Sequence, residues 1–394
     1  MEQPVDTSLL EKTASHAGSH SEKEEAILKA CQWRDLEALK ALAVSSGGFL
    51  TDALRQQAWP ILLGLPPGYT GTEEKEPDWR DLPRHRDEDQ VRLDVDRAFI
   101  YYPEIRSEAE LTRQKAELSA LILEVLRRHP YLHYFQGYHD ICQVLLLVLP
   151  PPLRAPSVSR LSVLRIRDFM LPTLSPALSQ LRLIPDILLA ADPQLWRHLS
   201  QVEPFFALSG TLTMYAHDIT TLGAISRLFD VLLAREPAFS VYLFAAIVRA
   251  RRAELFATPA DEPEMLHSIL CKLPRPLDID ALVAEAGRLC DAHPPERLAA
   301  WRSGISRNSV LRTARDAEAC AAQTMEDGEV FFRRHVAELK WLEKCDKAKE
   351  LLWQHRYRVR NAGFAVIIGI AALLLRRYPW AWQNAVSLMR RWLS

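Results

Sequence analysis

The sequence predicts an all-α protein. Apolar residues recur at helical spacing, as in Ile27, Leu28 and Cys31, followed by Leu36 and Leu39. No segment alternates apolar and polar residues between turn signals, which is the pattern expected of half-buried strands. Prolines outnumber glycines, 25 against 14, as suits a protein whose prolines mark helix ends. These three observations favour packed helices with no sheet.

Length and composition limit the class of protein. The 394 residues are enough for one large domain or two, and 48% are hydrophobic, which is enough for a sizeable core. The net charge of −1 argues against a nucleic-acid partner. The six cysteines form no Cys-x-x-Cys pair. They are typical of reduced thiols in a domain that faces the cytosol, most of them in its core. The 12 histidines show no ligand spacing, so no metal site is assigned, and no secretory signal is recognised.

The elements follow one another in a readable order. Residues 1–22 are polar and are predicted to be disordered, and helical periodicity begins at Lys23. The charged segment Arg84–Phe99 predicts a helix that ends close to Arg97, and Ser107 caps the next helix, Glu108–Arg128. Further helical patterns cover 141–149, 174–190, 194–201, 221–235, 236–253, 262–272 and 279–292. Within these, Ala238–Val248 would extend only about 16 Å, so it predicts a buried core helix and not a membrane span.

Two short motifs stand out as candidates for chemistry. The first is Val91–Arg97, an aliphatic-x-x-Asp-x-x-Arg segment that contains Asp94, and the second is Tyr134–Gly137, a Tyr-x-Gln-Gly segment that contains Gln136. Each motif alone is weak evidence, because Arg97 taken by itself is better explained as a solvated arginine paired with Asp94. Gln136 and the glycine after it are likewise explained by a loop before a helix.

Together and in this order, the two motifs resemble those of the TBC-domain GTPase-activating proteins, which act on Rab GTPases. The resemblance implies that Arg97 is an arginine finger and Gln136 a glutamine finger, both supplied in trans. It also implies that GTP and Mg²⁺ belong to the Rab partner and that the chain needs no cofactor of its own. The supporting motif residues would be Asp94, Tyr134, Gly137, Asp140, Arg55, Trp59, Arg227 and Asp230.

The resemblance extends through residues 23–300, the predicted TBC domain. Arg55 and Trp59 fit an Arg-x-x-x-Trp segment near its start, with Thr51 or Asp52 as the cap of its helix. The segments at 167–170 and 227–230 fit later parts of the family in order. Residues 210–215, Gly-Thr-Leu-Thr-Met-Tyr, depart from the tryptophan-rich stretch usual in the family, so local packing is expected to differ there.

The C-terminal part predicts a membrane-anchoring segment, as in a membrane-anchored member of this family. Residues 301–358 are expected to form a linker and a helical stalk, and 359–394 a membrane anchor. The uncharged stretch from Asn361 to Leu375 would reach about 22 Å as a helix, which is marginal for a span. Flanking arginines and aromatic residues suit an interface. A shallow hairpin or a buried C-terminal helix remain alternatives.

The leading functional hypothesis is therefore a Rab GTPase-activating protein of the early secretory pathway. It would be anchored on endoplasmic reticulum or Golgi membrane, with the catalytic domain facing the cytosol. Other endoplasmic reticulum membrane proteins are candidate partners through the tail. The alternative is a non-catalytic Rab-binding or membrane-scaffold protein with the same fold. The presence of both Arg97 and Gln136 argues against that alternative.

Overall fold

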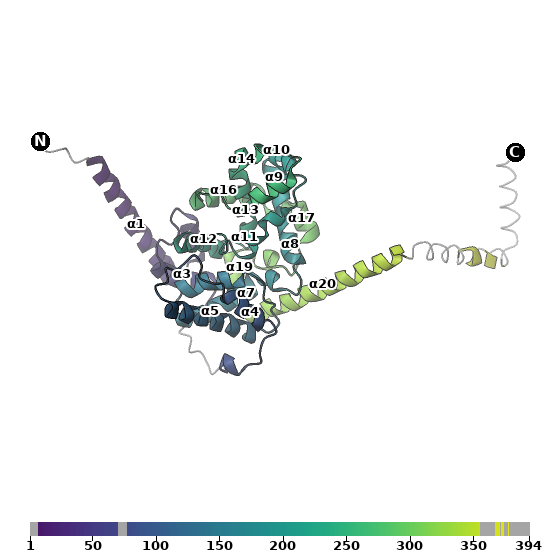
Figure 1. Cartoon of the computed structure of the whole chain (residues 1–394), viewed down its shortest axis with the longest axis horizontal. Helices are drawn as coiled ribbons and strands as arrows, with labels where there is room; N and C mark the ends of the chain where they lie inside the picture. The colour runs from purple at the N-terminus through teal and green to yellow at the C-terminus, as the bar shows by residue number, and fades with distance from the viewer. Residues whose placement is uncertain (1–6, 70–76, 355–366, 371, 374–376, 378–394) are drawn as a thin grey trace. The chain divides into compact units, whose positions relative to one another are not determined.

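The computed structural model describes residues 7–69, 77–354, 367–370, 372–373 and 377 (Figure 1). The chain divides into two compact units, Met1–His335 and Val336–Ser394. Every regular element within the described ranges is an α-helix or a short 3-10 helix. The all-α prediction is therefore confirmed.

The helix bounds follow the predicted patterns closely in most places. The elements up to residue 170 are α1 (Thr7–Trp33), α2 (Leu36–Val44), α3 (Asp52–Leu62), η1 (Trp79–Asp81), α4 (Glu88–Val95), α5 (Glu108–Arg128), α6 (Tyr138–Val148), α7 (Pro151–Leu164) and η2 (Arg167–Met170). Those that follow are α8 (Ser175–Leu181), α9 (Leu183–Ala191), α10 (Pro193–His198), η3 (Pro204–Ala207), α11 (Leu208–Leu212), α12 (Leu222–Ala234), α13 (Phe239–Ala250), α14 (Arg252–Phe256), α15 (Pro263–Leu270), α16 (Ile279–Ala292), η4 (Pro295–Arg297), α17 (Ala299–Gly304), α18 (Val310–Thr313), α19 (Ala317–Ala322) and α20 (Met325–Gln354).

The predicted N-terminal caps explain where two of these helices begin. The Thr51 hydroxyl accepts a hydrogen bond from the Leu54 N–H at 3.4 Å and caps α3. The Ser107 hydroxyl accepts from the Glu110 N–H at 3.2 Å and caps α5. Each hydroxyl satisfies a backbone donor that the helix itself leaves without a partner. Both starts are therefore set locally by sequence.

Helix α13 lies in the core of the first unit and packs against α9 and α16 (Figure 1). Its residues Phe239 and Val241–Val248 are all buried. A helix that is apolar on nearly every face is expected in the interior of a large domain. The prediction of a core helix here is confirmed.

A buried carboxylate joins α3 to α12. Asp230 is fully buried and accepts hydrogen bonds from Arg55 Nε at 3.0 Å and Trp59 Nε1 at 2.8 Å. It also accepts from the Phe49 N–H at 3.0 Å, just before α3 begins. A buried charge is tolerated when it is paired and its lone pairs are satisfied, as they are here.

The N-terminal prediction needs a correction. Helix α1 begins at Thr7, so the disorder predicted for residues 1–22 is wrong from Thr7 onward. Residues 7–22 hold several good helix formers, no proline and one glycine, so helix propensity favours continuation of the helix that was predicted from Lys23. Residues 1–6 lie outside the described residues.

The linker predicted to begin at residue 301 is instead folded onto the first unit. Trp301, Leu311 and Cys320, on α17, α18 and α19, are all buried. The cause is a tertiary contact that is invisible in the local sequence: the buried carboxylate of Asp168 accepts from the Val310 N–H at 3.1 Å. The unit therefore extends past the predicted boundary at residue 300.

The last described helix and the tail complete the chain. Helix α20 covers the segment for which a helical stalk was predicted, and its residue His335 approaches Asp168 at 3.6 Å. The predicted anchor, from Asn361 to Leu375 within 359–394, lies largely outside the described residues. In the part of the chain that can be described, no helix has the length and apolar character needed to cross a bilayer.

Candidate functional site

Arg97 lies just beyond the end of a helix and not within one. Helix α4 ends at Val95, and the Arg97 N–H bonds to the Asp94 carbonyl in the turn that follows, at 3.1 Å. The predicted helix from Arg84 to Phe99 is therefore too long at both ends. It stops early because Phe99 adopts a left-handed conformation, with φ of 65°, and gives its N–H to Gln143 Oε1 at 3.1 Å.

The Arg97 side chain is exposed but anchored. Its exposed fraction is 62%, and its Nη2 donates to Asp94 Oδ1 at 2.7 Å. The Arg97 Nε also donates to the Leu93 carbonyl at 3.3 Å. These bonds fix one side of the guanidinium, which has five N–H donors, and leave other donors directed to solvent.

Asp94 connects the two sequence motifs. It is fully buried, and its Oδ2 accepts from the Tyr134 hydroxyl at 2.9 Å. Its Oδ1 accepts from Gln90 Nε2 at 3.1 Å as well as from Arg97. Burial, with the Asp94 charge in addition, raises the pKa of Tyr134, so its hydroxyl stays protonated and keeps donating.

The loop that carries Gln136 turns sharply at Gly137. Gly137 has φ of 98° and forms the N-cap of α6, and Gln136 directly before it is exposed. A Cβ at Gly137 would lie 2.6 Å from Thr213 Cγ2, so any other residue would force Thr213 to shift. Glycine is therefore favoured by both the backbone conformation and the close approach of residue 213.

Arg97 and Gln136 line the same groove, which has a volume of about 640 Å³. Leu174, Leu208 and Leu212 supply much of its apolar wall. The two motif residues, far apart in sequence, thus share one concave surface of the first unit. Among the described residues, no group of three His, Cys, Asp or Glu side chains is placed to hold a metal ion.

Two histidines flank Asp140 in this groove. His217 Nδ1 lies 3.0 Å from Asp140 Oδ2, and His139 Nε2 lies 3.3 Å from Asp140 Oδ1. The hydrogen bond with Asp140 raises the pKa of His217, whereas burial lowers the pKa of His139. His217 therefore keeps its proton to a higher pH than an ordinary histidine, and His139 loses its proton at a lower pH.

Comparison with known proteins decides the family. Residues 52–256 match the Rab-GTPase-TBC domain. The chain belongs to this family. It is 32% identical to the human TBC1 domain family member 20, over 90% of this chain and 88% of that protein. It is 33% identical to the GTPase-activating protein gyp10 of Schizosaccharomyces pombe, over 78% of this chain and 82% of that protein.

The TBC fold is shown independently by a solved structure. The crystal structure of the Ypt/Rab-GAP domain of Gyp1p is 16% identical and has a TM-score of 0.51, covering 64% of this chain and 92% of that one. The resemblance stated from the two motifs is therefore confirmed at the level of family and fold.

The remaining motif residues of the TBC domain support the fold and do not line the groove. Arg55, Trp59 and Asp230 form the buried cluster between α3 and α12. Arg227 donates from Nη1 to the Ala43 carbonyl at 2.9 Å and from Nε to Asp280 Oδ1 at 3.0 Å, which joins α12 to α2 and α16. Their part in the motif is structural.

Several residues that line the groove were not assigned a role from the sequence, among them the polar residues Gln143, Thr213 and His217. A signal for Gln143 was available, because it is the lone polar residue in the apolar run of α6 and such a residue needs buried partners. Its Nε2 donates to the Tyr102 carbonyl at 2.9 Å. No local pattern marks Thr213 or His217, since both reach the groove from the 210–215 region and its following turn through tertiary packing.

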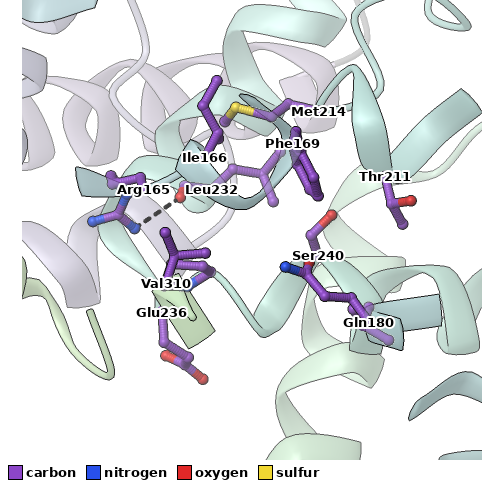
Figure 2. A pocket seen from close by; sticks show the side chains of 12 residues that line it. Arg165, Ile166, Phe169, Gln180, Thr211, Met214, Leu232, Glu236, Ser240 and Val310 are labelled. Carbon is purple, nitrogen blue, oxygen red and sulfur yellow. Dashed lines mark hydrogen bonds between the residues drawn. The ribbon is translucent and has the colours of Figure 1, made fainter. Parts of the chain in front are cut away.

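A second, smaller cavity of about 30 Å³ lies in the core of the TBC domain (Figure 2). It is lined by Ile166, Phe169, Val241 and other largely apolar residues, and by neither Arg97 nor Gln136. Figure 2 shows Arg165 at its edge, donating to the Leu232 carbonyl at 3.1 Å. This volume fits one or two waters and no substrate.

The first prediction concerns the glycine of the second motif. Gly137→Ala should lower the free energy of unfolding by about 1–3 kcal/mol, because alanine is strained at this φ and its Cβ meets Thr213. Gly223→Ala, where nothing lies within 4 Å of the added Cβ, is the matched control and should leave stability unchanged or slightly raised. Urea unfolding of both variants checks this. Equal effects at the two glycines would contradict it.

The second prediction concerns the charge of His217. Because its folded pKa lies above the ordinary 6.5, the ion pair with Asp140 stabilises fully below that value and is lost as pH rises through the folded pKa. Wild type should therefore exceed His217→Gln in melting temperature more at about pH 5.5 than at about pH 8.5. His139 and Asp218, the other titratable groups near His217, are present in both proteins. The difference should vanish in an Asp140→Asn background, and its persistence there would refute the pairing.

Proposed function

We propose that this chain is a GTPase-activating protein for Rab GTPases. The observation that carries the proposal is the placement of Arg97 and Gln136, both exposed, on one groove of a TBC domain. The names of two relatives support it, since the Schizosaccharomyces pombe and Saccharomyces cerevisiae proteins are both called GTPase-activating proteins.

Arg97 would stabilise the charge that develops on the transferring phosphoryl group. Its guanidinium is always charged and presents several N–H donors in fixed directions. A guanidinium supplied in trans is worth roughly 10³–10⁵ in hydrolysis rate. The bond to Asp94 restricts the side chain before the partner arrives, so less entropy is lost when it engages.

Gln136 would orient the attacking water. A carboxamide both donates and accepts, so it can hold a water in line with the γ-phosphate. The rigid turn at Gly137 and the packing of Thr213 against it would fix the position of this amide. GTP and Mg²⁺ would be carried by the Rab partner, and this chain would contribute positioning and electrostatics only.

The substrates we propose are Rab GTPases of the early secretory pathway, in traffic between the endoplasmic reticulum and the Golgi. This narrower proposal rests on the resemblance to a membrane-anchored member of the family, and the chain is similar over 90% of its length to the TBC1 domain family member 20 proteins of human, cow and mouse. A panel of Rab GTPases assayed with the full-length chain tests it.

The third prediction tests the two fingers. In single-turnover hydrolysis, Arg97→Ala and Gln136→Ala should each lower the stimulated rate by about 10³-fold. Arg92→Ala, an exposed arginine on α4 outside the groove, is the matched control and should keep full activity. The melting temperature of Arg97→Ala should fall by no more than about 4 °C, because Tyr134 and Gln90 still donate to Asp94.

Two outcomes would contradict the dual-finger mechanism. One is near-full activity of both Arg97→Ala and Arg97→Lys. The other is strict dependence on the Rab's own catalytic glutamine together with an active Gln136→Ala chain. Wild-type binding to GTP-loaded Rab without acceleration would favour the non-catalytic alternative instead.

We also propose that the C-terminal segment anchors the protein on endoplasmic reticulum or Golgi membrane, with the TBC domain in the cytosol. The support is the uncharged stretch 361–375 with arginines and aromatic residues on its flanks. Its described residues Ile367, Ile368, Ile370 and Leu373 are all more than half exposed. Other endoplasmic reticulum membrane proteins are candidate partners of this segment.

The fourth prediction tests the anchor. A chain cut before Val359 should move from membranes to cytosol yet keep its hydrolysis rate with lipid-free Rab, because the first compact unit ends at His335. The full-length double variant Ile367→Asp and Ile370→Asp is a second test that removes no residues. It should also be released from membranes, since charges oppose burial in lipid. Complete solubilisation of the unchanged chain by alkaline carbonate would refute the anchor.

A further inference from the structure

The loop after Arg97 presents two large apolar side chains to solvent. Ile100 is 74% exposed and Tyr101 is 58% exposed, and both line the same groove as Arg97 and Gln136. We call Ile100 and Tyr101 the apolar tip. Isolated exposed apolar residues are ordinary, but two adjacent ones at the rim of a functional groove form the kind of surface that a partner covers.

The apolar tip is held rigidly from both sides. The buried Phe99 precedes it and donates its N–H to Gln143 Oε1 at 3.1 Å, and the buried Tyr102 follows it and accepts from Gln143 Nε2 through its carbonyl at 2.9 Å. One buried amide thus clamps both ends of the loop. The Tyr102 hydroxyl adds a bond to the Ala216 carbonyl at 3.3 Å.

This clamp determines which way the tip points. With residues 99 and 102 buried, the two residues between them are left outside, so their exposure follows from the bonds to Gln143. A rigid apolar projection loses little conformational entropy when it is covered, which is the property of a good binding contact. Aromatic residues such as Tyr101 are enriched among the contacts that dominate binding energy.

We propose that the apolar tip docks on the nucleotide-dependent surface of the Rab partner and sets affinity for the GTP-bound form. This inference rests on the proposed function. Three Cα–Cα steps separate Ile100 from Arg97, a reach of at most about 11 Å. When Arg97 is at the transferring phosphoryl group, the tip therefore touches the part of the GTPase beside the nucleotide. Segments there are ordered by the γ-phosphate and released on hydrolysis, so the tip meets an ordered surface only before the reaction.

The division of labour within the groove follows from this placement. Arg97 and Gln136 act on the reacting groups and determine the maximal rate. The apolar tip contacts the Rab protein and determines the concentration of this chain at which that rate is reached. Loss of an interaction made equally in the ground and transition states raises the half-saturating concentration without lowering the plateau.

The test uses full-length chains in detergent and lipid-free Rab loaded with GTP, taking the Rab most stimulated by wild type. Single-turnover rates are measured against chain concentration for Ile100→Ser, Tyr101→Ser and the double variant. The half-saturating concentration should rise about 10-fold for each single variant and about 100-fold for the double one. The plateau rate should stay within about 2-fold of wild type.

Two controls define the effect. Leu189→Ser removes a side chain that is 43% exposed on α9, away from the groove, and should change neither quantity. Arg97→Ala should lower the plateau instead. A direct measurement completes the set: wild type should bind Rab loaded with a non-hydrolysable GTP analogue more tightly than Rab loaded with GDP, and the double variant should lose most of this preference.

Several results would overturn the inference. An unchanged half-saturating concentration in the double variant would remove the tip from the interface while leaving the proposed function intact. A fall in plateau with no change in half-saturation would place the tip in the chemistry. If light scattering shows that the double variant breaks a dimer at unchanged half-saturation, the tip binds a second copy of the chain instead. If wild type accelerates no Rab, the proposed function fails and this inference fails with it.

Discussion

The candidate site depends on one buried carboxylate. Asp94 receives the Arg97 guanidinium from its own segment and the Tyr134 hydroxyl from the second motif, at 2.7 and 2.9 Å. An unpaired carboxylate in this position would carry a large desolvation cost, so its burial depends on these donors together with Gln90, whose Nε2 also donates to it. The same bonds that satisfy the charge place the arginine beside the glutamine loop. The geometry of the site is thus tied to a single group that bonds to a residue of each motif.

The sequence predicted those features that depend on local chemistry. The start of α5 at Ser107 and the core character of α13 both follow from a few neighbouring residues, and the structure confirms them. The two motifs in their order identified the family because their residues, far apart in sequence, meet in the folded chain. What local chemistry cannot supply is the end of α4, which is fixed by Gln143 on another helix.

The predicted domain boundary at residue 300 is misplaced for a related reason. Residues 294–327 are rich in alanine, arginine and serine and lack clear periodicity, so nothing local distinguishes them from a linker. They are folded because Asp168 accepts from Val310 and because Arg167 Nη2 donates to the Asn308 carbonyl at 2.8 Å. Buried Arg167 and Asp168 need hydrogen-bond partners from a distant segment, and this tertiary requirement overrides local composition.

Three buried aspartates therefore organise the first compact unit, and each has a different consequence. Asp230 joins α3 to α12, Asp168 holds the segment around Val310, and Asp94 fixes the groove. In each case a carboxylate inside the protein orients side chains or backbone from separate segments. The groups proposed to act on the partner, Arg97 and Gln136, are by contrast exposed. An activator that works in trans needs this arrangement, because a finger must project into another protein while its base stays fixed. The buried Asp94 carboxylate holds the fixed end of the Arg97 side chain and does not occupy the surface that the partner has to cover.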